Sequence, residues 1–226
     1  MADTKKKIEV EISATDKASQ VFSALEGKTK ALGIAFGALA GAAIGGAVIS
    51  FFSDSTRAAA EESDTMQKLS RQIERLGASY SSVGTYLDTE FKRIQNTTRF
   101  ADDEAAAALT ELIQKTGDYA FSVNNLSLIT DIAAARGEGL VSVSEKIGLA
   151  YQGNLRGLRQ LGVGTKDMTV AFDELRKRYG GEAARDLESY GGKFRQIHNL
   201  FEELKETAGR ELLPVISDIA KAMKEW

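Results

Sequence analysis

Cysteine is absent from this chain, and proline and histidine occur only once each among its 226 residues. Without cysteine there are no disulfides, no thiolate nucleophiles and no cysteine-based zinc sites. A single proline leaves long stretches free to form helix, because proline lacks a backbone donor and clashes with the preceding turn. The net charge of −3 is near balance. We therefore expect no sequence-specific nucleic-acid partner, since phosphate binding needs a concentrated basic surface.

Charge is also missing from Ala31 to Ser53, and this apolar run is the strongest single feature of the sequence. As a helix it would extend about 35 Å, enough to cross the hydrocarbon core of a bilayer. Glycines recur at every fourth position and fall on one helical stripe: Gly33, Gly37, Gly41 and Gly45. Such a stripe lets two helices approach closely. The run is predicted to be a membrane-active or lumen-packed oligomeric helix, with a buried core helix as the alternative.

A period of two marks the stretch from Lys7 to Ala14, where Ile8, Val10 and Ile12 alternate with charged or polar neighbours. This alternation predicts a short β-strand. A lone strand needs a partner, so it would pair between subunits or with a neighbouring protein. The alternative is an extended N-terminal arm without a partner.

The rest of the sequence predicts a mainly α fold. A polar helix is expected from Asp54 to Leu76, with an apolar seam spaced by 3, 4 and 3 residues: Met66, Leu69, Ile73 and Leu76. This spacing is that of a coiled coil and predicts self-association. The seam is short, so an amphipathic helix packed on a globular core fits equally well.

Shorter helices with turn signals follow and predict a compact helical module over residues 81–165. The acidic run Asp102–Glu104 opens one helix, where negative charge meets the positive end of the helix dipole. Ser122 is expected to begin the next helix. Ser142 and Glu145 have the spacing of a capping box for a third.

Beyond the module, Met168–Tyr179 is predicted to be one amphipathic helix, with interruptions at Gly180–Gly181 and Gly191–Gly192. A second coiled-coil seam then follows, with alternating steps of 3 and 4: Phe194, Ile197, Phe201 and Leu204. Pro214 predicts a kink or a helix break. The expected divisions are an N-terminal strand or arm (1–15), a long helical region (16–80), the compact module (81–165) and amphipathic helices continuing toward a coiled coil (166–226).

No residue pattern in the sequence carries catalytic, metal-binding or cofactor chemistry. His198 lies beside the second seam with neither a nucleophile nor a second ligand nearby in the sequence. The Gly162–Gly164 turn does not follow a predicted strand, so a phosphate-binding loop has no structural context. We therefore expect neither enzyme activity nor a cofactor.

Three stretches resemble phage tail tape measure proteins. The first is KIEVEISATDKASQVFSAL, followed at once by the apolar run. The second comprises TTRFADDEAAAALTELIQKTGD and LITDIAAARGEGLVSVSEKIGLAYQGNLRGLRQLGV. The third is KFRQIHNLFEELKETAGRELLPVISDIAKAM, with a Gly-x-x-Leu-x-Pro pattern from Gly209 to Pro214. The likeness covers most of the chain. It lies in the order and composition of the segments rather than in one diagnostic motif.

This resemblance implies a scaffold rather than a catalyst. Such proteins occupy the tail tube as a homo-oligomer, often a trimer, while tube subunits polymerise around them, and helix length sets tail length. They leave ahead of the DNA at genome ejection, and apolar segments help to cross the host inner membrane. The implied partners are further copies of the chain, the tail tube protein, the tail tip or baseplate hub proteins and the host inner membrane. The implied locations are the virion tail lumen, the host cytoplasm during assembly and the host membrane at infection.

The length of 226 residues departs from the family, whose members are usually much longer. Even a fully helical chain of this length would measure only about 340 Å. This departure leaves three explanations: the chain is a fragment, it belongs to a particle with a very short tail, or it has lost the length-setting role. Two other classes stay open: a membrane-inserting pore-forming or effector protein, which would permeabilise liposomes, and a soluble helical adaptor bundle, which would be monodisperse in buffer.

Overall fold

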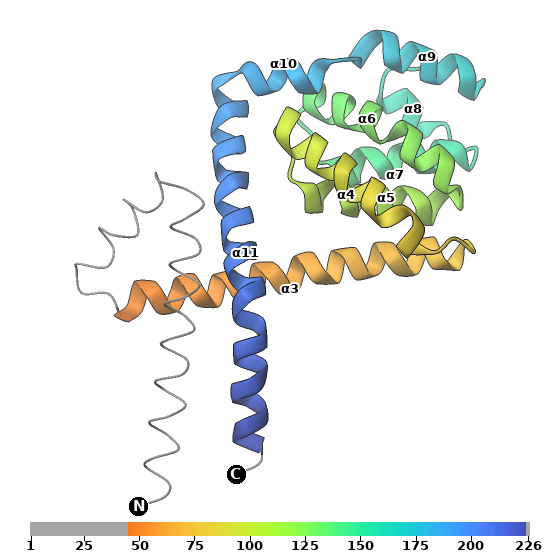
Figure 1. The fold of residues 1–226 in the computed structure, drawn as a ribbon. Coiled ribbons are helices and arrows are strands. Elements are labelled where there is room, and N and C mark those ends of the chain that lie inside the picture. Colours follow the sequence, from red (N-terminus) through yellow and green to blue (C-terminus); the bar gives the residue numbers. More distant parts are fainter. Residues whose placement is uncertain (1–44, 225–226) are drawn as a thin grey trace, which may run out of the picture. The chain divides into compact units, whose positions relative to one another are not determined.

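The computed structural model describes residues 45–224, and this part of the chain is mainly helical, as predicted (Figure 1). No strand occurs between residues 45 and 224. The predicted strand with Ile8, Val10 and Ile12 lies outside the described residues. The chain divides into two compact units. One spans Ser63–Leu200 and is called the helical module below. The other, called the crossing unit, includes residues 45–62 and 201–224.

Helices account for most of both units (Figure 1). Their bounds are α3 Gly45–Arg75, α4 Tyr80–Thr97, α5 Asp102–Thr116, α6 Tyr119–Arg136, α7 Leu140–Tyr151, α8 Arg156–Gln160, α9 Met168–Tyr179, α10 Glu182–Glu188 and α11 Tyr190–Lys224. Two of them, α3 and α11, are shared between the units, because the division falls within each helix. The bounds of α9 confirm the helix predicted for that stretch.

The core of the helical module lies around α5, which packs against α4, α6 and α7. Its largest fully buried side chains include Phe91, Leu109, Leu112, Leu126 and Ile129. Burying each such side chain contributes about 1.5–3 kcal/mol. Two later helices, α9 and α10, also pack on α6. The module is therefore wider than the stretch 81–165 expected from the sequence.

Local capping explains where the module helices begin. In α5, the Glu104 carboxylate accepts a hydrogen bond from the Ala101 backbone N–H at 3.0 Å, so the acidic run does open this helix. In α6, the Asp118 carboxylate accepts from the Phe121 N–H at 2.9 Å. This bond and a second from the Tyr151 hydroxyl lower the pKa of Asp118. Because Asp118 is the cap, α6 begins at Tyr119, and the predicted start at Ser122 is wrong.

Two further boundary predictions are also wrong. Helix α7 begins at Leu140 after Gly139, so Ser142 already lies in the first turn and forms no capping box with Glu145. Helix α11 begins at Tyr190, so the glycine pair expected to interrupt the chain lies inside its first turn. The Ser189 hydroxyl caps this helix by accepting from the Gly192 N–H at 3.0 Å.

Pro214 does not end a helix, because α11 continues to Lys224. Proline removes one backbone donor and crowds the preceding turn. In a helix of 35 residues the remaining ladder of hydrogen bonds continues on both sides of it. The predicted helix break is therefore wrong.

In the crossing unit, α3 and α11 approach closely at Gly209. A Cβ atom on Gly209 would lie 2.6 Å from the Ser55 carbonyl carbon and 2.9 Å from the Ala59 Cβ. Ser55, Ala59 and Ala208 are all buried. One turn along α3, Glu62 forms an ion pair with Arg210 at 3.3 Å. Small side chains thus set the distance between the two helices at this crossing.

We predict that Gly209→Ala destabilises the crossing unit by about 1–3 kcal/mol, the usual cost of forcing extra atoms into a packed contact. Hydrogen exchange should become faster in peptides from residues 54–62 and 201–210. Gly191→Ala is the matched control on the same helix, because a Cβ there meets only the Ser189 hydroxyl at 4.0 Å. It should leave exchange unchanged or slow it. Equal behaviour of the two variants would show that the crossing is not tight.

Candidate self-association surface

The first turns of α11 expose a row of large apolar side chains. Tyr190 is 98% exposed, Phe194 74%, Ile197 54% and Phe201 52%. Their spacing of 4, 3 and 4 residues places them on one face of the helix. These four residues are called the α11 stripe. Leu200, which is 53% exposed, lies beside it, whereas Leu204, the last residue of the predicted seam, is half-buried.

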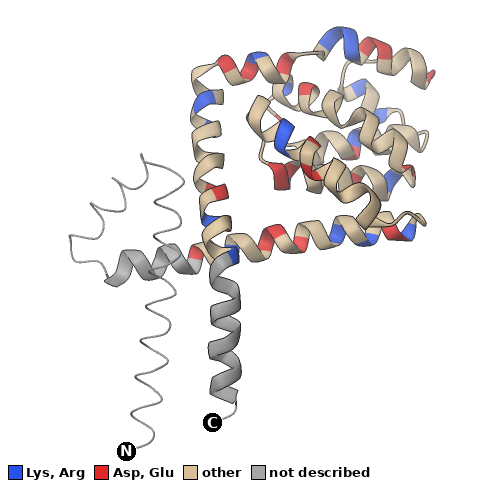
Figure 2. Cartoon of the chain, in the orientation of Figure 1, with Lys and Arg blue, Asp and Glu red and all other residues tan. Residues whose placement is uncertain are grey.

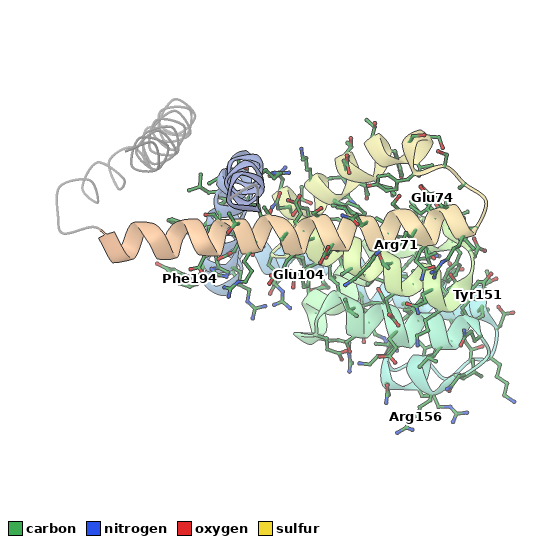
Figure 3. All side chains as sticks on the ribbon, turned by 90° about the horizontal axis from the view of Figure 1, so that it is seen from below. Arg71, Glu74, Glu104, Tyr151, Arg156 and Phe194 are labelled. Atoms are coloured by element: carbon green, nitrogen blue, oxygen red, sulfur yellow. The ribbon has the colours of Figure 1, made fainter. Side chains whose placement is uncertain are left out.

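The opposite side of this helix segment is polar and faces the helical module. The Gln196 amide donates to the Asn96 carbonyl oxygen at 3.2 Å, and the Asn199 amide donates to the Arg99 carbonyl oxygen at 2.9 Å. A surface helix ordinarily turns its apolar face toward the core and its polar face toward water. Here the polarity is reversed, with the apolar face outward. Figure 3 labels Phe194 on this helix.

Arg99 anchors the polar side of α11 through its backbone carbonyl, while its side chain joins α10 and α6. Its side chain is buried, and its Nε lies 3.3 Å from a carboxylate oxygen of Asp186 in α10, an ion pair without hydrogen-bond geometry. Its Nη2 donates to the Ala133 carbonyl oxygen near the C-terminus of α6 at 3.3 Å. A cation is favoured at that end of a helix. Burial lowers the pKa of Arg99, and Asp186 opposes this shift.

The turn between α10 and α11 is equally close-packed. A Cβ on Gly192 would lie 2.7 Å from the Leu187 Cα. Only glycine therefore fits at this point of α11 without moving α10. Together with the Arg99 contacts, this approach fixes the direction in which the α11 stripe faces.

The surface around the stripe is mixed in charge. Lys193 and His198 are exposed on either side of it, and Lys205 forms an ion pair with Glu202 at 2.7 Å. Figure 2 shows acidic and basic residues interspersed over the helices rather than gathered into one-signed areas. Among the described residues, no group of three or more His, Asp or Glu side chains is placed to hold a metal ion.

The first predicted seam, on α3, lies mostly in the core of the helical module rather than on the surface. Leu69 and Ile73 are fully buried in the core of the helical module, and Met66 is partly buried against it, with the Tyr80 hydroxyl 4.0 Å from its sulfur. Only Leu76 is exposed. The amphipathic-helix alternative describes this seam, because its apolar partner is the core of the helical module in the same chain. Leu69 and Ile73 are therefore not surface residues of a single copy.

The glycine-striped run falls mostly outside the described residues. Gly33, Gly37 and Gly41 lie there, and Gly45 is the first residue of α3. Within the part that the structure describes, no helix is long and apolar enough to cross a bilayer.

Sequence reasoning missed Tyr190, the most exposed apolar residue of the stripe. The signal was present, since Tyr190 precedes Phe194 by four residues and extends the same 3-4 spacing. It was hidden by Gly191–Gly192, which were expected to interrupt the helix. The hydrogen bond from Asn199 to the Arg99 carbonyl had no sequence signal, because the two residues lie 100 positions apart.

Comparisons with known proteins add no relative: the chain matches no family model, no curated protein and no solved structure.

We predict that Arg99→Met lowers the free energy of unfolding by about 1–3 kcal/mol. Removing one partner of a buried ion pair costs about 3–5 kcal/mol, and the partial exposure of Asp186 reduces this. Arg93→Met is the control, because the Arg93–Glu90 pair lies on the surface of α4 and should contribute less than about 1 kcal/mol. Urea unfolding measures both. Equal losses would contradict the anchoring role of Arg99.

We also predict opposite outcomes for the two seams. Leu69→Ala should cost about 2–5 kcal/mol because it opens a cavity in the core. Phe194→Ser should change the stability of a single copy by less than about 0.5 kcal/mol, as expected for a surface site. Urea unfolding at low protein concentration separates these effects from association. A large loss for Phe194→Ser under those conditions would mean that the stripe is packed within its own chain.

Proposed function

We propose that this chain is a structural protein of a phage tail, a tape measure protein or scaffold that lies inside the tail tube. The observation that carries the proposal is the outward apolar stripe on α11, a helix of 35 residues. A helix that turns its polar side to its own module and its apolar side outward is suited to packing against another protein. The resemblance of three stretches to tape measure proteins supports a phage tail as the assembly.

In this proposal, helix length is the physical measure. An α-helix rises about 1.5 Å per residue, so α11 alone corresponds to about 52 Å. Copies of the chain associate through the α11 stripe, and tube subunits polymerise around them until the helices are covered. The tail tube protein and the tail tip or baseplate hub proteins are the proposed partners, in addition to further copies of the chain.

Release at genome ejection forms the second part of the proposal. The uncharged run from Ala31 to Ser53 would pack in the tube lumen and then contact the host inner membrane. The tail lumen of the virion, the host cytoplasm and finally the host membrane are the successive locations proposed. The second seam, exposed on α11, is proposed to form the coiled-coil contact between copies.

The decisive experiment measures tail length by electron microscopy after the segment Phe194–Lys221 is duplicated in the parent genome. The duplication adds about four heptads, or roughly 42 Å of helix. A ruler predicts tails longer by that amount. The control inserts a Gly/Ser segment of equal residue number at the same site, which adds no fixed length.

Tails of unchanged length after duplication would reject the ruler role for α11 and leave an anchoring or ejection role. Particles without tails would reject the proposal as a whole. In that case purified protein should be tested on liposomes, because permeabilisation would favour the membrane-inserting alternative.

A further inference from the structure

We propose that the α11 stripe is covered by the same stripe of a second copy, with the two helices antiparallel about a two-fold axis. This pairing rests on the proposed self-association but does not depend on a tail. It would keep the stripe out of water in protein that has not yet been assembled.

The exposed area suits one copy of the chain as the partner. Aromatic side chains bury about 150–250 Å² each, so the stripe and Leu200 together offer roughly 600 Å² of apolar surface. Two copies would bury about 1,200 Å², the lower limit for a stable specific interface. A patch of this size is at or above what monomeric soluble proteins usually expose.

The two-fold register follows from where the stripe begins and ends. A centre between Arg195 and Gln196 brings Tyr190 of one copy opposite Phe201 of the other, and Phe194 opposite Ile197. All four exposed residues then find an apolar partner. A shift by one heptad in one direction would pair Ile197 and Phe201 with positions before the start of α11. A shift in the other direction would pair Phe194 with the half-buried Leu204 and Tyr190 with the buried Ala208, so the self-complementary register buries the most exposed apolar area.

Charge and size at the flanks also favour the antiparallel arrangement. In it, Lys193 lies near Leu200 of the second copy, whose side chain can pack on the aliphatic part of the lysine. His198 lies near Gly191, which leaves room for the imidazole. A parallel, in-register pair would instead place Lys193 beside His198, so that the lysine stem would lose the apolar partner that Leu200 provides. Antiparallel helices also oppose their dipoles.

The absence of cysteine makes the pairing directly testable by disulfide formation in the full-length chain. Copies with Tyr190→Cys are mixed under reducing conditions with tagged copies carrying Phe201→Cys and are then oxidised. The mixture should form the mixed disulfide, because these positions face each other. Either variant alone should not cross-link, since equivalent residues would lie about 16 Å apart along the axis and a disulfide needs Cα atoms within about 7 Å.

Sedimentation of the unmodified chain provides the second measurement, with an expected mass of two copies. Ile197→Glu should reduce this to one copy, and its circular dichroism should stay helical. Tyr86→Glu is the matched control, because Tyr86 is an exposed aromatic residue on α4, away from the stripe, and should leave the pair intact. If Ile197→Glu does not fold, Ile197→Ser replaces it.

Two results would overturn the inference. Cross-linking of Tyr190→Cys to itself would show a parallel arrangement. A sedimentation mass of one copy for the unmodified chain would show that no second copy covers the α11 stripe. Neither result decides the tail proposal, which depends on tail length in particles. Conversely, unchanged tails would leave the antiparallel pair standing.

Discussion

The placement of α11 depends on one buried residue, Arg99, whose side chain and backbone carbonyl make separate contacts. The guanidinium group contacts Asp186 of α10 and a carbonyl at the end of α6, while the Arg99 backbone carbonyl accepts a hydrogen bond from Asn199 of α11. A buried arginine is costly unless its charge and donors are matched. The side chain of Arg99 therefore joins α10 to α6, and its backbone carbonyl joins the start of α11 to the same residue.

The outward apolar stripe is a consequence of that constraint. Once Asn199 and Gln196 face the module, the residues on the other side of the helix must face away from it. The module has its own complete core and offers Phe194 no site. The same helix therefore has two functions in the chain, closing the module with its polar side and presenting an apolar side to another protein. Both the proposed tail assembly and the proposed two-copy pairing use this division.

Much of the fold could be predicted from residue order. Helical periodicity gave the mainly α class and the bounds of Met168–Tyr179, and the acidic run at Asp102–Glu104 correctly marked a helix start. Boundaries set by a single cap were less predictable. Asp118 rather than Ser122 caps the start of α6. Its carboxylate accepts one hydrogen bond from the Phe121 N–H and one from the Tyr151 hydroxyl, and the second forms only in the folded chain. The glycine pair before Phe194 lies inside α11, where the Ser189 hydroxyl caps the helix and Gly192 leaves room for the backbone of α10.

The two seams mark the limit of sequence information most clearly. Leu69 and Ile73 have the same spacing as Phe194 and Ile197, and the sequence alone determined that each set lies on one face of a helix. Spacing specifies a stripe but not the surface that covers it. Tertiary structure decided that helices of the same chain bury the first stripe and that the second stays exposed. The physical reason is that burial depends on which distant segments pack on each stripe: the apolar core of the module covers the first, whereas hydrogen bonds to Asn96 and Arg99 turn the second away, and no local pattern encodes either contact.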